Sequence, residues 1–274
     1  MELKNVLVCS IQEKFRAHMS DKLILGGNPP HYHTNWLLYL LMDGEFEFCI
    51  EEKRYTVKSG DLLLIPPRII CHRICPELIA VSRGVVYFDA SFLDPSMAEI
   101  IIPMNEYLVD VNGSLDEVKS LFNKLVREGE QPDEFSGGNI RGYISELISI
   151  FFRMQRKGAD IHKKSSPTFV EASISFIKNN YTSHITLVDA AKYVSVSSKY
   201  LSRTFKKEIG INFKEYLNLY RLKQSERMIL EQPEKSILEI AYDNGFEDSN
   251  YFSACFKKQY GVTPSVFKKT KNPQ

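Results

Sequence analysis

The stretch ITLVDAAKYVSVSSKYLSRTF, residues 185–205, decides the fold of the C-terminal part of the chain. Its apolar and small residues recur at intervals of three and four, the spacing of one helix face, in two groups: Leu187, Ala191 and Val194, then Leu201 and Phe205. The serine-rich break at residues 195–198 can end the first helix and cap the second. The pattern predicts a helix-turn-helix.

A second copy of this pattern follows about fifty residues later. The first helix and its turn recur with an offset of 50, as Leu187, Ala191, Val194 and Val196 become Ile237, Ala241, Asn244 and Phe246. The second helix recurs with an offset of 51, as Leu201, Phe205 and Gly210 become Phe252, Phe256 and Gly261. The change of offset predicts one extra residue in the second turn, and the duplication indicates two DNA-reading heads.

Residues 213–230, between the two copies, have the pattern of one continuous helix. At about 1.5 Å per residue such a helix is about 27 Å long. That length is close to the roughly 34 Å between successive major-groove faces of B-DNA. We therefore expect the two heads to read adjacent major grooves of double-stranded DNA.

The run GFEDSNYFSACFKKQYGVTPSVFKK, residues 245–269, resembles the second helix-turn-helix of the AraC/XylS family of bacterial transcription regulators. Spaced glycines, aromatics, a lysine pair and Thr263-Pro264 carry the resemblance, which covers residues 167–274. By position it implies these base-reading residues: Lys199, Ser202, Arg203, Ser249, Asn250 and Ser253. Phosphate contacts are expected from Ser198, Lys206, Lys207, Lys257 and Lys258.

Two features qualify this interpretation of the heads. Family members often carry Arg at the position of Ala254, so we expect the second head to read fewer bases here. Ser197, Ser198 and Asp248 also sit where helix starts need capping oxygens, so part of their polarity is structural.

Composition is ordinary for a soluble protein, with 43% hydrophobic and 25% charged residues. From residue 167 onward there are 16 Lys and Arg against 11 Asp and Glu, a net charge of +5, which leaves −4 for the rest of the chain. This asymmetry suits binding a polyanion with the C-terminal part alone. Neither a membrane span nor a secretory signal is expected.

The chain has five cysteines, an odd number at irregular spacing, which argues against a disulfide framework and favours a reducing cytoplasm. Cys71 and Cys75 read as ordinary buried thiols.

Short β-rich runs dominate residues 1–112: residues 36–42, 45–50, 54–57, 61–65, 78–88 and, less clearly, 100–111. Turn signals such as Asp43-Gly44 separate them. Such a series indicates a sandwich or small barrel that can hold one small ligand. Residues 1–25, ahead of these runs, are interpreted as a movable arm.

Residues 30–72, with PHYH and GDLLLIPP, resemble the cupin-type sensor domain that often precedes this DNA-binding domain. Cupin enzymes hold a metal through an HxH pair, a glutamate four residues later and a distant histidine. His31 and His33 are present, but Leu37 takes the glutamate position and Cys71 the last histidine position. His72 is one residue late, which turns a strand side chain to the other face. We therefore expect no metal, no cofactor and no catalytic residues.

Effector binding is instead assigned to polar and aromatic residues of the barrel: His31, His33, Trp36, Tyr39, Phe46, Phe48 and His72. A purely structural role for the two histidines and a core role for most of the aromatic residues stay open.

Two helices follow the barrel, over residues 115–125 and 140–154. Both can pack on the barrel, but the apolar stripe of the second is wide, which predicts a homodimer through it. The residues expected at that interface are Ile140, Tyr143, Ile144, Leu147, Ile148, Phe151 and Met154.

Together these patterns predict an α+β chain of two domains, a cupin-like barrel with two following helices and an all-α double helix-turn-helix domain. The expected boundaries are 1–112 for the barrel, 113–156 for the dimerisation helices, 157–166 for a linker and 167–274 for the DNA-binding domain.

The predicted function is a ligand-responsive transcription activator, not an enzyme, whose partners are operator DNA, a sugar or small acid, RNA polymerase and a second copy of the chain. The alternatives are a metal-dependent cupin enzyme tethered to a DNA-binding module, and a regulator whose barrel only dimerises.

Overall fold

The computed structural model of the chain describes residues 8–9, 14–24, 27–51, 53–74, 78–101, 104, 106–157 and 168–271. The predicted linker at 157–166 lies almost wholly outside these residues, as does Cys75. Across the described ranges, none of the helices has the length and apolar character needed to cross a membrane.

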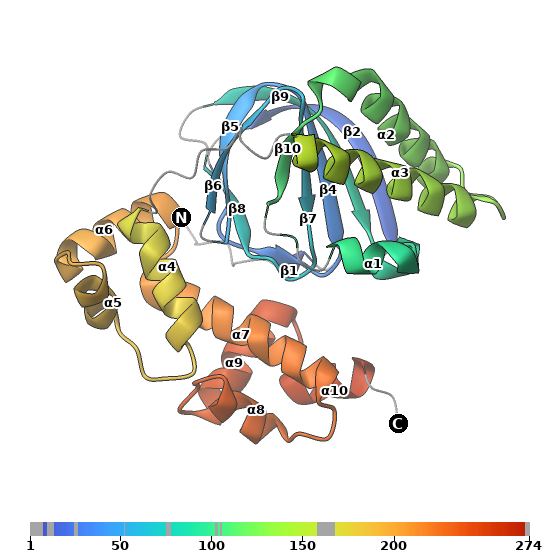
Figure 1. Cartoon of the computed structure of the whole chain (residues 1–274). Coiled ribbons are helices and arrows are strands. Elements are labelled where there is room, and N and C mark those ends of the chain that lie inside the picture. Colours follow the sequence, from blue (N-terminus) through green and yellow to red (C-terminus); the bar gives the residue numbers. More distant parts are fainter. Residues whose placement is uncertain are drawn as a thin grey trace.

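The N-terminal part is a β-barrel of two facing sheets (Figure 1). Five strands form one sheet, in the order β10 (Leu108–Asp110), β7 (Asp61–Ile65), β4 (Trp36–Asp43), β9 (Ile79–Phe88) and β2 (Phe15–Ile24). Three strands form the other, in the order β6 (Lys53–Lys58), β5 (Glu45–Ile50) and β8 (Cys71–Ile74). The short strands β1 (Val8–Cys9) and β3 (Tyr32–His33) pair in parallel at one end.

Strand β4 shows how one sheet is buried on both faces. Leu37, Tyr39 and Leu41 point into the barrel and pack on the three-stranded sheet. Alternate residues, Trp36 among them, point outward into a second core that the helices cover. A strand buried on both faces is a continuous apolar run in the sequence, which is why the pattern of residues 36–42 predicts it.

Two segments differ from the expectation. Residues 15–24 are strand β2, paired with β9 along its whole length, and so do not belong to a movable arm. Phe15, Ala17 and Met19 lie on one face of β2, but Asp21 takes the next position on that face and Lys22 follows it, so the apolar alternation is too short to predict the strand. The run at 100–111 is not one strand, since helix α1 (Pro95–Ile101) takes its start and β10 only its end.

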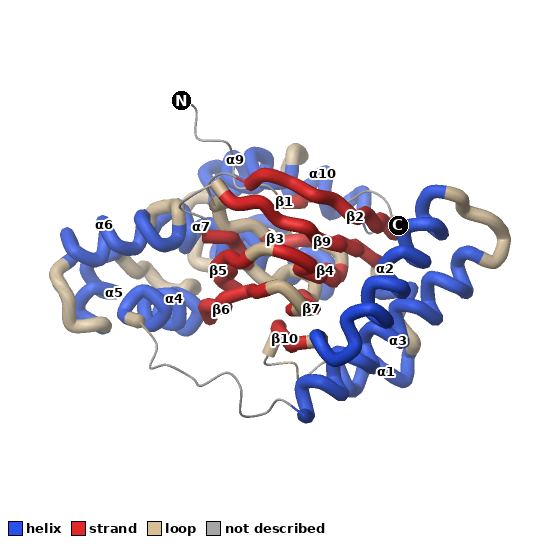
Figure 2. Tube along the Cα trace, turned by 90° about the horizontal axis from the view of Figure 1, so that it is seen from above, coloured by secondary structure: helices blue, strands red, loops and turns tan. Residues whose placement is uncertain are grey.

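Helices α2 (Leu115–Glu130) and α3 (Ser136–Lys157) lie on the outer face of the five-stranded sheet, as Figure 2 shows from above. Most residues of the predicted dimer stripe on α3 pack against this sheet. Five of its seven residues are buried in the chain's own core: Ile140, Ile144, Leu147, Ile148 and Phe151. Side chains with at most 5% of their surface exposed cannot form the apolar centre of an interface, so these five are not the interface residues predicted. Only Tyr143 and Met154 of the stripe are partly exposed.

The C-terminal part is all helical, in the order α4 (Phe169–Asn180), α5 (Leu187–Tyr193), α6 (Ser198–Ile209), α7 (Phe213–Glu231), α8 (Ile237–Asp243), α9 (Ser249–Tyr260) and α10 (Pro264–Lys271). Helix α7 runs between the pair α5–α6 and the pair α8–α9 (Figure 1). Each pair packs on α7 through its own core, which contains Phe205 in the first and Phe252 in the second.

Candidate nucleic-acid interface and effector site

The two predicted heads are built on the same plan. Helices α5 and α8 have seven residues each and begin with a capping box, in which Thr186 and Ser236 bond to the backbone three residues on. Helices α6 and α9 have twelve residues each and end at Gly210 and Gly261, whose left-handed φ angles are +85° and +79°.

The turns confirm the change of offset. In both, a backbone bond of 3.0 Å closes on the preceding helix, from Val196 to Ala191 and from Phe246 to Ala241. The extra residue of the second turn is Glu247, which comes directly before the N-cap Asp248. Its carboxylate bonds to the exposed ring of His184, ahead of the first head, at the groove between the two heads.

The base-reading candidates lie along α6 and α9, and four of the six are exposed. On α6, Lys199, Ser202 and Arg203 are exposed, as are Lys206 and Lys207. On α9, Asn250, Lys257 and Lys258 are exposed. Ser198 of α6 and Ser249 and Ser253 of α9 are half-buried. Basic and hydroxyl groups on an open helix face can bind phosphates and base edges.

Two aromatic residues on these faces are not among the predicted contacts. Tyr200 and Tyr251 occupy equivalent positions, 51 residues apart, and are 44% and 43% exposed. The Arg203 guanidinium lies 5.9 Å from the Tyr200 ring centre. The Tyr251 hydroxyl accepts a 2.7 Å hydrogen bond from Asn218 on α7, in the groove between the heads. Their recurrence at the offset of 51 was the available signal.

Inside the barrel, the sensor candidates separate into two groups. Tyr39, Phe46 and Phe48 face one another between the sheets, with ring centres 5.9 and 6.1 Å apart along the series. Trp36 is on the opposite face of the sheet, stacked on Phe88 in the core under the helices, so it does not line the interior. The alternation of a strand separates residues that the sequence grouped by type.

His72 does not lie at the predicted effector site either. Its neighbour Cys71 belongs to the interior core, whereas the His72 ring bonds at 3.3 Å to the backbone carbonyl of Glu208 on α6. Burial lowers the pKa of His72 to about 4. His72 therefore contacts the DNA-binding domain, not an effector.

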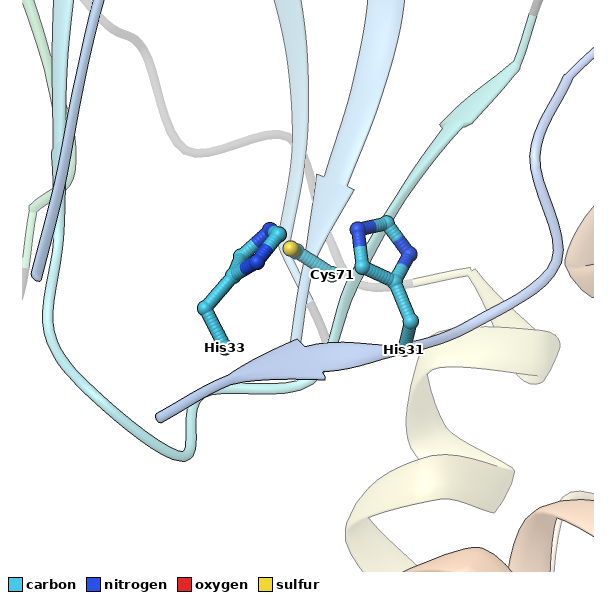
Figure 3. A group of neighbouring side chains, drawn as sticks. All are labelled: His31, His33 and Cys71. Atoms are coloured by element: carbon cyan, nitrogen blue, oxygen red, sulfur yellow. The ribbon is translucent and has the colours of Figure 1, made fainter. Parts of the chain in front are cut away.

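His31 and His33 do face the interior, on either side of Cys71 (Figure 3). Ligand atoms of the three side chains all lie within 4.8 Å of one another, and all three side chains are buried. Burial, followed by the neighbouring His31, lowers the pKa of His33 to about 3. Both rings are neutral at neutral pH, because burial also lowers the pKa of His31.

Tyr32, between these two histidines, points the other way. Its hydroxyl donates a 2.9 Å hydrogen bond to the carboxylate of Glu226 on α7 and also bonds to the hydroxyl of Tyr260, the last residue of α9. Arg68 of the barrel lies 3.6 Å from the same buried carboxylate. One residue of strand β3 thus connects the barrel wall to the second head.

Three ion pairs also join the barrel to the helical part. Glu51 pairs with Lys178 of α4 and, at 3.2 Å, with Lys223 of α7. Burial alone would raise the pKa of Glu51, but the charges of Lys223 and Lys178 outweigh it and lower that pKa. Arg54 pairs with Glu208 of α6 at 2.9 Å.

Comparison with known proteins agrees with this architecture. Residues 27–142 match the family model of the AraC-like ligand binding domain, and residues 190–270 match that of a helix-turn-helix domain. The Msm operon regulatory protein of Streptococcus mutans is 24% identical over 88% of this chain and 86% of its own length.

Two more relatives span most of the chain. The melibiose operon regulatory protein of Escherichia coli is 23% identical over 87% of this chain and 83% of its own length. The lactose operon transcription activator of Staphylococcus xylosus is 30% identical over 85% and 83%. Family models match both the barrel and the helical part, and a relative that is 30% identical spans most of the chain. The chain therefore belongs to the AraC family of transcription regulators.

Proposed function

We propose that the chain is a ligand-responsive, sequence-specific transcription activator that works as a homodimer in the cytoplasm and recruits RNA polymerase. Strand β3 carries this proposal. His31 and His33 face the barrel interior, whereas Tyr32 between them contacts Glu226 and Tyr260 of the DNA-binding domain. A ligand that moves β3 changes both faces together, which is the differential contact that coupling between two sites requires.

The effector that suits the interior is a sugar or a small acid. Tyr39, Phe46 and Phe48 supply an aromatic wall, and the Arg83 guanidinium lies 5.6 Å from the Tyr39 ring centre. Aromatic faces beside a few polar groups bind sugar rings, and a guanidinium binds hydroxyl or carboxylate oxygens. Relatives named after melibiose and lactose operons support the sugar.

On DNA, we assign base contacts to the exposed faces of α6 and α9 and phosphate contacts to the lysine pairs that end those helices. Replacing Lys206 by Gln is expected to weaken binding to all sequences alike and to reduce the salt slope by about 1. An unaltered slope would remove Lys206 from the phosphate contacts.

The test begins with the full-length protein and a random DNA pool, from which one preferred sequence is expected to emerge. Sugars and small acids are then screened by thermal shift, and DNA affinity is measured with and without any stabilising compound. Tyr32→Phe is expected to keep effector binding while reducing its effect on DNA affinity. If the protein prefers no DNA sequence over random competitor, it is not a sequence-specific regulator. If an effector binds but leaves DNA affinity unchanged, the barrel and the DNA-binding domain are not coupled.

Homodimer formation needs a surface outside the five buried residues of α3. Tyr143 and Met154 are the members of the predicted stripe that keep exposed area. Light scattering on Tyr143→Lys with Met154→Lys is expected to report a monomer if the dimer uses this edge of α3. An unchanged dimer would place the interface elsewhere.

A metal-dependent cupin enzyme is the second candidate, because His31, His33 and Cys71 bring three donor atoms together. The enzyme hypothesis predicts that the metal-loaded protein converts a substrate into a product. Metal binding without turnover, combined with a specific DNA site, would reject it.

A further inference from the structure

The backbone brings His31, His33 and Cys71 together on one face. His31 and Cys71 form an isolated antiparallel bridge, with hydrogen bonds of 3.0 and 2.8 Å between their main chains. Residues bridged in this way carry their side chains side by side, and a residue two positions on points to the same face. His33 is two positions after His31, and the two rings meet edge to face with centres 4.9 Å apart.

Each of the two rings has one nitrogen that can bind a cation. Among the described residues, His33 Nδ1 is buried without a hydrogen-bond partner, although the side chain is only 4% exposed. An orphaned buried nitrogen needs an explanation, and an unfilled ligand position supplies one. His31 Nδ1–H donates a hydrogen bond of 3.0 Å to the carbonyl of Pro29, so the lone pair is on Nε2. The Asn28 amide lies 3.5 Å from Nε2, and a cation would replace that long contact.

We propose that His31, His33 and Cys71 form a binding site for a thiophilic divalent cation of the zinc class. Two imidazole nitrogens and one thiolate are a donor set that Zn²⁺ prefers, unlike the histidine and carboxylate set of cupin enzymes. Bonds of about 2.0–2.3 Å put tetrahedral ligands about 3.3–3.8 Å apart. The present limit of 4.8 Å therefore has to shrink by about 1 Å. Binding releases the thiol proton of Cys71 to solvent.

Three protein ligands leave a fourth position open. In zinc sites of this kind, water or a ligand oxygen takes it. The Arg73 guanidinium lies 5.9 Å from the ring centre of Phe46 in the barrel interior, so an anionic or strongly polar ligand is favoured beside the site. The cation would thus anchor a small molecule as well as the strand.

A filled site also has a consequence for DNA binding, which rests on the proposed function. The cation would fix His31 and His33 relative to β8, and the backbone between them carries Tyr32 to Glu226 and Tyr260. Occupancy then stabilises one placement of β3 against the second head. The metal measurements below use no DNA, so they succeed or fail independently of the regulatory role.

The test is a titration of the full-length, chelator-treated protein with Co²⁺, a spectroscopic substitute for Zn²⁺. We expect one equivalent to bind, a thiolate-to-cobalt charge-transfer band to appear, and Zn²⁺ to displace the cobalt. Cys71→Ser is expected to remove the band, and His33→Gln to weaken binding by about 100-fold or more, the upper range for loss of a supporting group.

Cys49→Ser is the matched control. Cys49 is also a buried thiol, but it pairs across the strands with His72, on the face opposite to Cys71, and lies beside Arg54. It should leave the band and the affinity unchanged, and circular dichroism should show that every variant is folded. A folded wild-type protein that binds no stoichiometric cation, a band that survives in Cys71→Ser, or a band that Cys49→Ser removes would each overturn the site.

Discussion

The two helix-turn-helix copies share one backbone plan and differ in chemistry. Helix lengths, N-terminal capping and glycine ends agree between them. Arg203 of the first head, however, corresponds to Ala254 of the second, and Lys199 to Asn250, at the offset of 51. The caps and the core fix the fold, so the exposed positions were able to diverge without changing it.

The turns also differ where the backbone is most demanding. Ser195 and Gly245 are equivalent and both adopt a left-handed conformation, with φ of +58° and +80°. A Cβ on Gly245 would lie 2.4 Å from the carbonyl oxygen of Tyr181, which Arg221 holds by a 2.8 Å hydrogen bond. The second turn is therefore restricted to glycine by its neighbours as well as by its φ angle.

Gly245→Ala is expected to produce the largest effect, a loss of about 3 kcal/mol in the free energy of unfolding, because left-handed strain and a backbone clash add. Urea unfolding measures it. Gly210→Ala is the control, since that site has a similar φ but open space around it, and should cost only about 1 kcal/mol. Equal losses would show that the contact with Tyr181 is irrelevant.

Arg203→Ala is expected to cost about 1–3 kcal/mol of DNA binding and to relax specificity at one base pair. The reciprocal change, Ala254→Arg, should add a preference at the corresponding position of the second head. Binding to a panel of single-base variants of the preferred site measures both. A loss that is equal on all sequences would make Arg203 a phosphate contact.

The heads also differ in which barrel residue holds them, His72 for the first and Tyr32 for the second. The pKa of His72 is about 4 when folded and 6.5 in the unfolded chain, so the unfolded state binds more protons between these values. Stability is complete above pH 6.5 and falls as pH drops, by about 1.4 kcal/mol at pH 5.5.

His72→Gln should make the unfolding free energy less dependent on pH by that amount between pH 7.5 and 5.5. His31 and His33 are depressed in the same direction, and they cancel in the comparison because both proteins contain them. Tyr32 does not titrate in this range, since burial raises its pKa well above the usual value. An identical pH profile for the two proteins would show that His72 is not the group responsible.

Ser195→Gly is expected to give the smallest effect, a gain of up to about 1 kcal/mol, because glycine adopts the left-handed conformation without strain. Its greater freedom in the unfolded chain offsets part of that gain. Thermal unfolding of the two proteins measures it. A destabilised variant would show that the Ser195 side chain makes a compensating contact.

Local patterns predicted most elements of the fold. Strands β5 and β7 have the bounds expected for them. The change of offset between the two helix pairs correctly predicts the extra residue of the second turn. Strand β2 was missed because an edge strand with polar inward residues lacks a clear apolar alternation. The dimer prediction for α3 named five residues that face the chain's own sheet, since an apolar stripe does not specify which surface covers it.

Residues close together in the chain specify the duplicated heads, their caps and most strands of the barrel, so these features could be predicted from local patterns. The direction in which each sensor residue faces depends on how distant segments pair. Cys71 and His72 are adjacent, yet one lies beside His31 and His33 and the other touches α6. Pairing of Cys71 with His31, forty residues away, sets that difference, and a contact between distant segments leaves no local pattern to read.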